Sequence, residues 1–103
     1  ILVELIDAAE IRLAPAAPQT AQSMLRSGPG ARLLEGLRGA EPADRDALAD
    51  LISRISVFFA ENADLISEIE INPVMVRADG KGLVAADALI VLSSNADEQE
   101  KLT

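Results

Sequence analysis

Hydrophobic and polar positions follow two rhythms along the chain, and each rhythm predicts a type of element. Between residues 44 and 62 the apolar side chains recur at steps of three and four, the spacing of one face of an α-helix. These side chains are Leu48, Leu51, Ile52, Ile55, Phe58 and Phe59. Asp44 and Asp46 lie near the start of this segment, where the helix dipole favours negative charge. We expect a helix over 44–62 whose apolar stripe packs on a sheet and forms the main core.

The first half of the chain carries shorter patterns. Residues 1–6 read as a strand already under way, and residues 10–14 alternate polar and apolar, so the two segments predict a hairpin. A helix is expected over 18–27, because Pro18 suits a first helical turn, where its missing N–H costs nothing. The side chains expected to be buried here are Ala21, Met24, Leu25, Leu33 and Leu34. A chain that opens inside a strand indicates a fragment of a longer polypeptide.

Residues 67–77 and 83–92 are two apolar runs rich in β-branched side chains, which is typical of strands. Asp79-Gly80 lies between them, and this dipeptide is a strong signal for a hairpin with a two-residue turn. Such a turn fixes the register, because Ala78 then pairs with Lys81 and the pairing continues outward. A bulge at Gly82 would instead move every later side chain to the other face.

In this register Asn72 lies opposite Asp87, with their Cβ atoms about 5 Å apart. Glu70 precedes Asn72 by two residues and shares its face. The rest of that face is apolar: Val74, Val76, Leu83, Ala85 and Leu89. An unpaired carboxylate on such a strip is costly, and a divalent cation such as Mg²⁺, which prefers hard oxygen ligands, would remove the cost. The alternative is structural, because Asn-Pro ends strands and an Asp often accepts backbone N–H groups.

Composition narrows the classes of function. The chain has 103 residues, the size of one domain, and two Phe are its only aromatic residues, so the core must be aliphatic. It has no Cys and no His, which excludes disulfides, thiolate catalysis and the commonest general base within this chain. A net charge of −8 argues against binding to nucleic acid or to an anionic membrane. We expect a soluble, cytoplasmic domain over residues 1–92, followed by an acidic tail or linker over 93–103.

Three segments carry a resemblance to a known family. Residues 68–76 (EIEINPVMV), followed by a turn and residues 85–87 (AAD), resemble the metal-binding hairpin of the ATP-grasp fold in the nucleoside-diphosphate-forming acyl-CoA synthetases, which include succinyl-CoA synthetase. Residues 12–15 (RLAP) and 33–39 (LLEGLRG) are similar to segments of the ADP-forming branch. The motifs occur in the order of that family and together span about residues 1–92.

The resemblance implies a fold and a set of site residues. It implies an α+β fold, with a mainly antiparallel sheet and helices on one face, that forms the C-terminal piece of an ATP-grasp domain. Asn72 and Asp87 match ligands of a Mg²⁺ ion that bridges the phosphates of ATP or ADP. Glu70 matches a catalytic carboxylate near the phosphorylated histidine when that residue visits the nucleotide site. Arg38 lies between two glycines, where it either contacts nucleotide phosphate or pairs on the surface with Glu35 or Glu41.

The resemblance also implies partners that this chain lacks. The family converts a carboxylate, CoA and ATP into acyl-CoA, ADP and phosphate through a phosphohistidine, and the chain has no His. A CoA-binding domain and the remaining ATP-grasp subdomain would supply the missing parts, so the chain alone should be inactive. The alternative is a non-catalytic regulatory or interaction module that retains the ATP-grasp fold. For Glu4 and Arg12, on the first predicted hairpin, a structural or solvated role is favoured.

Overall fold

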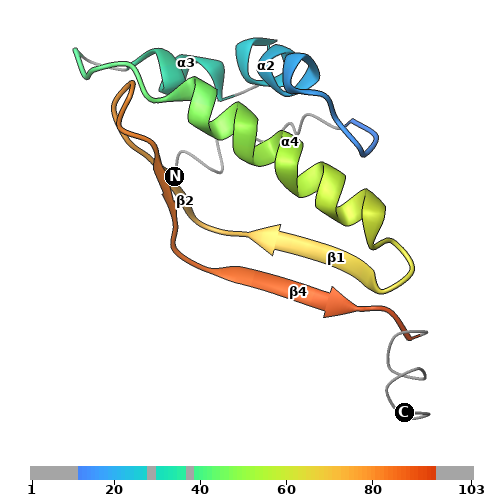
Figure 1. Ribbon diagram of the computed structural model, residues 1–103. Coiled ribbons are helices and arrows are strands. Elements are labelled where there is room, and N and C mark those ends of the chain that lie inside the picture. Colours follow the sequence, from blue (N-terminus) through green and yellow to red (C-terminus); the bar gives the residue numbers. More distant parts are fainter. Residues whose placement is uncertain (1–11, 28–29, 37–38, 95–103) are drawn as a thin grey trace.

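The structure, a computed structural model, describes residues 12–27, 30–36 and 39–94. Its elements are α2 (Pro18–Ser27), α3 (Ala31–Glu35), α4 (Arg45–Glu61), β1 (Ile66–Ile71), β2 (Val74–Val76), β3 (Leu83–Ala85) and β4 (Ala88–Leu92). The strands form two antiparallel pairs, β1 with β4 and β2 with β3. Helix α4 runs between α2 and the β1–β4 pair (Figure 1). The expected α+β architecture with antiparallel strands is therefore confirmed.

Helix α4 begins and ends at polar residues that cap it. The side chain of Asp44, the N-cap residue, accepts a hydrogen bond from the Ala47 N–H at 3.1 Å. At the other end, Asn62 donates its backbone N–H to the Phe59 carbonyl, and its side chain donates to the Phe58 carbonyl. The predicted helix over 44–62 is confirmed, and its two outermost residues are the caps.

The main core does not lie along the apolar stripe of α4. The most buried residues of α4 are Ala49 (2% exposed) and Ser53, and α2 contributes Ala21 (0% exposed) where the two helices pack. The stripe is only half-buried, and Phe58 is 48% exposed. A mainly apolar hollow of about 420 Å³ remains between α4 and β1. The expectation that the stripe and a sheet form the main core is wrong, because the small residues on another face of α4 allow α2 to approach closely.

Two serines of α4 hold the segment that leads into α2. Ser53 donates its hydroxyl to the Ala16 carbonyl at 2.7 Å, and the Ala16 N–H donates to the Ser56 hydroxyl at 2.8 Å. Ser53 is buried inside a helix, and this bond satisfies its hydroxyl. The serines therefore tie residues far apart in the sequence.

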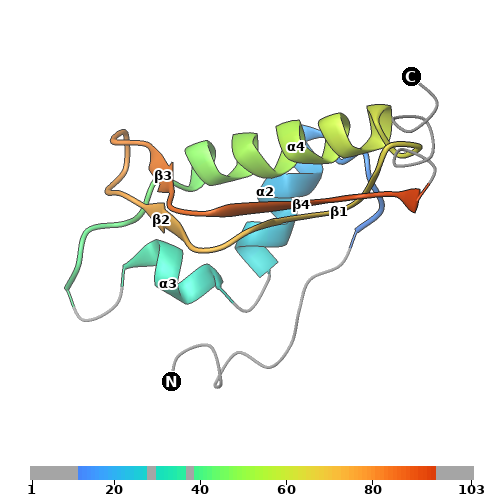
Figure 2. The same ribbon diagram turned by 90° about the horizontal axis from the view of Figure 1, so that it is seen from below.

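The register of the hairpin agrees with the two-residue turn at Asp79-Gly80. The turn is closed by a hydrogen bond from the Lys81 N–H to the Ala78 carbonyl at 2.8 Å, and Gly80 has a φ of 79°. The pairs that follow are Val76 with Leu83, Met75 with Val84, Val74 with Ala85, Ile71 with Ala88 and Glu70 with Leu89. There is no bulge at Gly82; the ladder shifts only between Ile66 and Glu68. Figure 2 shows the two strand pairs following one another along this hairpin, with α4 beside both.

Each of the two long predicted strands is divided in two. The ladder is interrupted at Asn72-Pro73 and at the facing residues 86–87, because proline has no N–H to donate. Burial changes phase at the same place: Ile69 and Ile71 are half-buried before the interruption, and Val74 and Val76 after it. The expectation of one apolar strip along a single face is therefore wrong.

The two ends of the chain are described only in part. The predicted hairpin of residues 1–6 with 10–14 lies mostly outside the described residues, and the described part, residues 12–14, is not a strand; Leu13 is 91% exposed. Of the predicted tail, Ser93 is still bonded to the Leu65 and Asp64 carbonyls, and residues 95–103 lie outside the described part. Among the described residues, no helix has the length and apolar character needed to cross a membrane.

Candidate functional site

The interruption in the hairpin brings the three oxygen-bearing side chains together. Glu70 lies near the end of β1, Asn72 follows β1, and Asp87 directly precedes β4. The Asn72 N–H donates to the Asp87 carbonyl at 3.1 Å, which places these residues opposite each other, as the turn predicted. The side chains of Glu70, Asn72 and Asp87, here called the oxygen cluster, line a hollow of about 30 Å³ together with Ala88 and Leu89.

The oxygen cluster is open to solvent. All three of its residues are exposed, so the expected cost of carboxylates on a buried strip does not arise in this chain. Asp87 Oδ1 accepts the Ala88 N–H at 2.9 Å, so the structural role accounts for one oxygen of that carboxylate. Within the described part of the chain, neither the Glu70 nor the Asn72 side chain makes a hydrogen bond or ion pair. Both Glu70 oxygens, the Asn72 amide oxygen and Asp87 Oδ2 remain available to a ligand.

The donor set fits a hard cation that brings some of its own ligands. Two carboxylates and one amide oxygen are donors that suit Mg²⁺. The described residues contain no group of three or more Asp, Glu, His or Cys side chains that would hold a metal by themselves. Mg²⁺ usually keeps several waters and binds through one or two carboxylates and substrate phosphates. The cluster therefore fits one side of a Mg²⁺–nucleotide complex better than a closed protein site.

The glycine-rich segment around Arg38 is described only at its flanks. Arg38 itself lies outside the described residues. Gly36 has a φ of 94°, and a Cβ atom on it would collide with the backbone carbonyl of Ala40. The close approach that this glycine permits is therefore to the chain itself. A hydrogen bond from the Ala43 N–H to the Leu34 carbonyl at 2.8 Å fixes the segment that returns toward α4.

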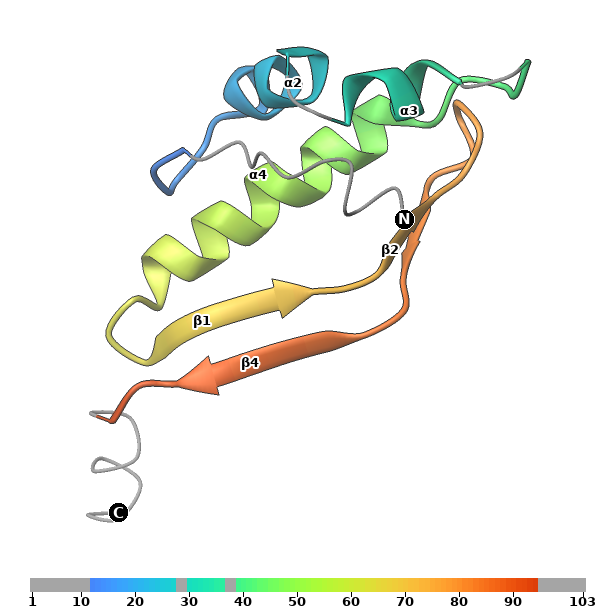
Figure 3. The same ribbon diagram turned by 180° about the vertical axis from the view of Figure 1, so that it is seen from behind.

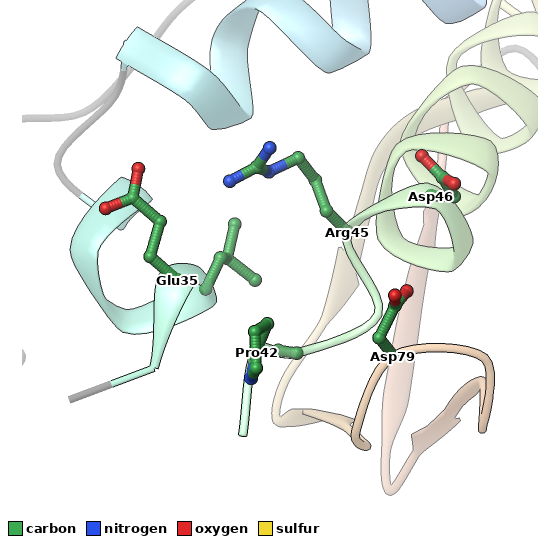
Figure 4. Close-up of a pocket in the computed structure, with 7 residues that line it drawn as sticks. Glu35, Pro42, Arg45, Asp46 and Asp79 are labelled. Atoms are coloured by element: carbon green, nitrogen blue, oxygen red, sulfur yellow. The ribbon is translucent and has the colours of Figure 1, made fainter. Parts of the chain in front are cut away.

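Another hollow, of about 350 Å³, lies at the beginning of α4 (Figure 4). Its lining residues are Leu34, Glu35, Pro42, Ala43, Arg45, Asp46 and Asp79. The Arg45 side chain extends from α4 into the space between Glu35 and Asp46, and its Nε is buried with no hydrogen-bond partner among the described residues. Sequence reasoning missed this hollow because its walls come from three separate segments. It lies near the turn of the hairpin and shares no residue with the oxygen cluster.

Comparison with known proteins decides the family of the chain. Residues 1–92 match the family model of an ATP-grasp domain. The chain belongs to the ATP-grasp family. The beta subunit of the ADP-forming acetate–CoA ligase II of Pyrococcus furiosus is 35% identical over 92 residues, which cover 89% of this chain and 39% of that subunit. This ATP-grasp chain therefore spans well under half of the length of that relative.

Two solved structures have the same fold as this ATP-grasp chain. The structure of PH1788 from Pyrococcus horikoshii superimposes with a TM-score of 0.81 at 33% identity, covering 90% of this chain and 39% of that one. A dinucleotide-forming acetyl-coenzyme A synthetase from Candidatus Korarchaeum cryptofilum gives a TM-score of 0.78 at 33% identity, covering 90% and 42%. That enzyme was solved with coenzyme A and Mg-AMPPCP, with its phosphohistidine segment pointing towards the nucleotide-binding site. Two of these three relatives are named as enzymes that form acetyl-CoA, and the matched region makes up 39% of one and 42% of the other.

Proposed function

We propose that this chain is the C-terminal part of the ATP-grasp domain of an ADP-forming acyl-CoA ligase. The observation that carries the proposal is the oxygen cluster, in which Asn72 and Asp87 face each other across the hairpin with side-chain oxygens free for a ligand. Membership of the family and its ligase relatives support the same conclusion. The reaction would join a carboxylate to CoA at the expense of ATP, giving ADP and phosphate, with a phosphohistidine on another domain.

Each residue of the oxygen cluster has a distinct task in this proposal. The Asn72 amide oxygen and the free Oδ2 of Asp87 would hold Mg²⁺ on the nucleotide phosphates. When bound, the metal would neutralise charge on the phosphates. Glu70 would accept a hydrogen bond from the imidazole of the incoming histidine, because its two oxygens make no bond within the described chain. It would thereby orient the ring toward the phosphate that it receives.

The proposal requires partners outside this chain. The histidine has to come from elsewhere, because none of the 103 residues is a histidine. We propose that the remaining ATP-grasp subdomain closes over the nucleotide and that a CoA-binding domain delivers the phosphohistidine, both in the cytoplasm. Arg38 stays a candidate for a contact with nucleotide phosphate, with a surface ion pair to Glu35 or Glu41 as the alternative.

The test is made in the full-length protein that carries this chain. Asp87→Asn is nearly isosteric and removes one negative charge from the proposed metal site, so formation of the phosphohistidine should fall by at least about a hundredfold. The control is Asp64→Asn, an exposed carboxylate in the turn before β1, which should leave the rate unchanged. Phosphohistidine is measured by transfer of radiolabelled phosphate from Mg·ATP.

Two results would contradict the proposal. Full activity of the Asp87→Asn protein would mean that the chemistry lies elsewhere. A full-length protein that forms no phosphohistidine with intact Glu70, Asn72 and Asp87 would favour the non-catalytic module, which retains the fold without the reaction.

A further inference from the structure

The turn end of the hairpin is held by one residue from another part of the chain, Asp44. Asp44 is only 7% exposed, although it carries a carboxylate. Its Oδ1 accepts the Ala47 N–H at 3.1 Å and so caps α4. Its Oδ2 accepts the Gly82 N–H at 2.8 Å, and its own N–H donates to the Arg77 carbonyl at 2.7 Å. Both carboxylate oxygens and the backbone of Asp44 are therefore engaged.

Asp44 supplies the partners for one of the two hydrogen bonds that a pair of residues in neighbouring strands normally makes. In an antiparallel ladder, two hydrogen-bonded residues exchange both N–H···O bonds. Arg77 donates its N–H to the Gly82 carbonyl at 2.9 Å, as such a pair requires. In place of the return bond, the Gly82 N–H goes to Asp44 Oδ2, and the Arg77 carbonyl accepts the Asp44 N–H. Asp44 is thus hydrogen-bonded to both strands of the hairpin at one register position.

Further hydrogen bonds join residues 42–44 to the hairpin, and this line of contacts is here called the seam. The Asp79 N–H donates to the Pro42 carbonyl at 2.9 Å, and Ala43 forms an isolated antiparallel bridge with Ala78. Figure 3 shows the closed end of the hairpin beside the beginning of α4, where this seam lies. The segment over residues 42–44 therefore acts as a short third strand at the turn.

We propose that Asp44 is a positioning residue for the oxygen cluster, an inference that rests on the proposed function of that cluster. The strands between Asp44 and the cluster, β2 and β3, have three residues each, and an isolated two-stranded hairpin is marginally stable in water. The ladder is interrupted at the cluster, where the Asn72 N–H bond to the Asp87 carbonyl joins the two strands. By fixing Arg77 on one strand and Gly82 on the other, Asp44 sets how Asn72 and Asp87 face each other.

The test separates the two roles of Asp44, its hydrogen bonds to the hairpin and its capping of α4. Asp44→Ser keeps a good N-cap but is too short to reach Gly82 as well. Two quantities are measured in the full-length protein: the Mg²⁺ concentration that gives half-maximal phosphohistidine formation, and the hydrogen-exchange protection of the Asn72 amide. We expect the Mg²⁺ requirement to rise about tenfold, as for other residues that orient metal ligands, and the Asn72 protection to fall. The matched control is Ser53→Ala, which removes a buried hydrogen bond away from the hairpin and should change neither quantity.

The outcomes distinguish this inference from the proposed function. Unchanged Asn72 protection in the Asp44→Ser protein overturns the positioning role, whatever the activity does. An unchanged Mg²⁺ requirement overturns it as well, provided that Asp87→Asn impairs the reaction; if Asp87→Asn does not, the proposed function fails instead and Asn72 protection alone decides. Equal effects of Asp44→Ser and Ser53→Ala would reduce Asp44 to a general structural residue. If Asp44→Ser does not fold, Asp44→Asn is measured by the same two readouts, because its amide nitrogen cannot accept the second N–H.

Discussion

At Gly36 the absence of a side chain allows the chain to turn back on itself. The position has a positive φ, and the space where a Cβ would stand is occupied by the Ala40 carbonyl. Gly80 has a similar φ of 79°, but nothing lies within 4 Å of its Cβ position. The two glycines therefore share a positive φ and differ in steric room.

Alanine substitutions at these two positions should separate the two effects. Gly80→Ala should cost about 1–2 kcal/mol, the price of a left-handed backbone for a residue with a Cβ. Gly36→Ala should cost at least about 1 kcal/mol more, because the neighbouring backbone must also move. The measurement is urea unfolding of the 103-residue chain and its two variants. Equal losses would show that the Ala40 carbonyl yields without cost.

Single residues also show what the sequence could and could not predict about the site. The turn at Asp79-Gly80 was sufficient to place Asn72 opposite Asp87, because each step of a ladder follows from the one before it. The exposure of the cluster was not predictable, since it depends on what the rest of the molecule covers. The hydrogen bond between Asp44 and Gly82 was not predictable either, because helix capping alone explains an Asp at that position.

Among the elements, α4 shows the limit of a periodic pattern. Periodicity predicted the helix and its extent over residues 44–62, because apolar spacing is a local signal. It did not predict which face meets the tightest contact. Ala49 and Ser53 lie outside the apolar stripe, yet they are the most buried residues of α4, because their small size lets α2 approach. Where a helix packs depends on side-chain volume as well as on hydrophobicity.

A larger side chain at Ala49 should therefore be more harmful than its apolar character suggests. Ala49→Leu should destabilise the chain by about 1–3 kcal/mol, because the added atoms have no room between α4 and α2. Val57→Leu, at an exposed position of the same helix, should change the free energy of unfolding by less than about 0.5 kcal/mol. Both values come from urea unfolding curves. An unchanged free energy of unfolding for Ala49→Leu would mean that α2 and α4 pack less tightly than the burial of Ala49 indicates.

Shortening side chains of the apolar stripe tests how tightly the stripe packs against the hairpin. Leu51 and Ile55 are half-buried, so Leu51→Ala or Ile55→Ala should cost toward the lower end of the usual 2–5 kcal/mol for buried aliphatic residues, at about 2 kcal/mol. An unchanged thermal midpoint for either variant would show that the stripe makes no packed contact with the hairpin.

At the scale of the whole molecule, the β1–β4 pair has more apolar surface than the described residues cover. The exposed large apolar side chains of β4 are Leu89, Ile90, Val91 and Leu92. Several large apolar side chains left exposed on one strand are often covered by another element. The chain spans 39% of the Pyrococcus furiosus subunit, so the proposed remainder of the ATP-grasp domain is the natural cover. The sequence showed that these residues are apolar, but not what covers them.

The absence of the proposed facing subdomain bears on nucleotide binding by the isolated chain. Among the residues that the structure describes, no basic side chain lines the hollow of the oxygen cluster, so none of them offers a positive charge to the nucleotide phosphates there. The net charge of −8 adds repulsion that Mg²⁺ only partly screens. In the proposed function, the oxygen cluster forms only one wall of the nucleotide site, so its affinity depends on the subdomain that faces it.

We therefore expect the 103-residue chain to bind Mg·ATP with a dissociation constant of about 1 mM or weaker, corresponding to roughly 4 kcal/mol, and to show no ATPase or ligase activity. Calorimetric titration of the chain with Mg·ATP measures the affinity, and the full-length protein titrated under the same conditions is the control, with binding expected to be at least about tenfold tighter. Asp87→Asn in the full-length protein should also weaken binding of Mg·ATP, because the substitution removes one negative charge from the proposed metal site. Micromolar binding by the isolated chain would show that the oxygen cluster, or the segment around Arg38, forms a complete nucleotide site without a facing subdomain.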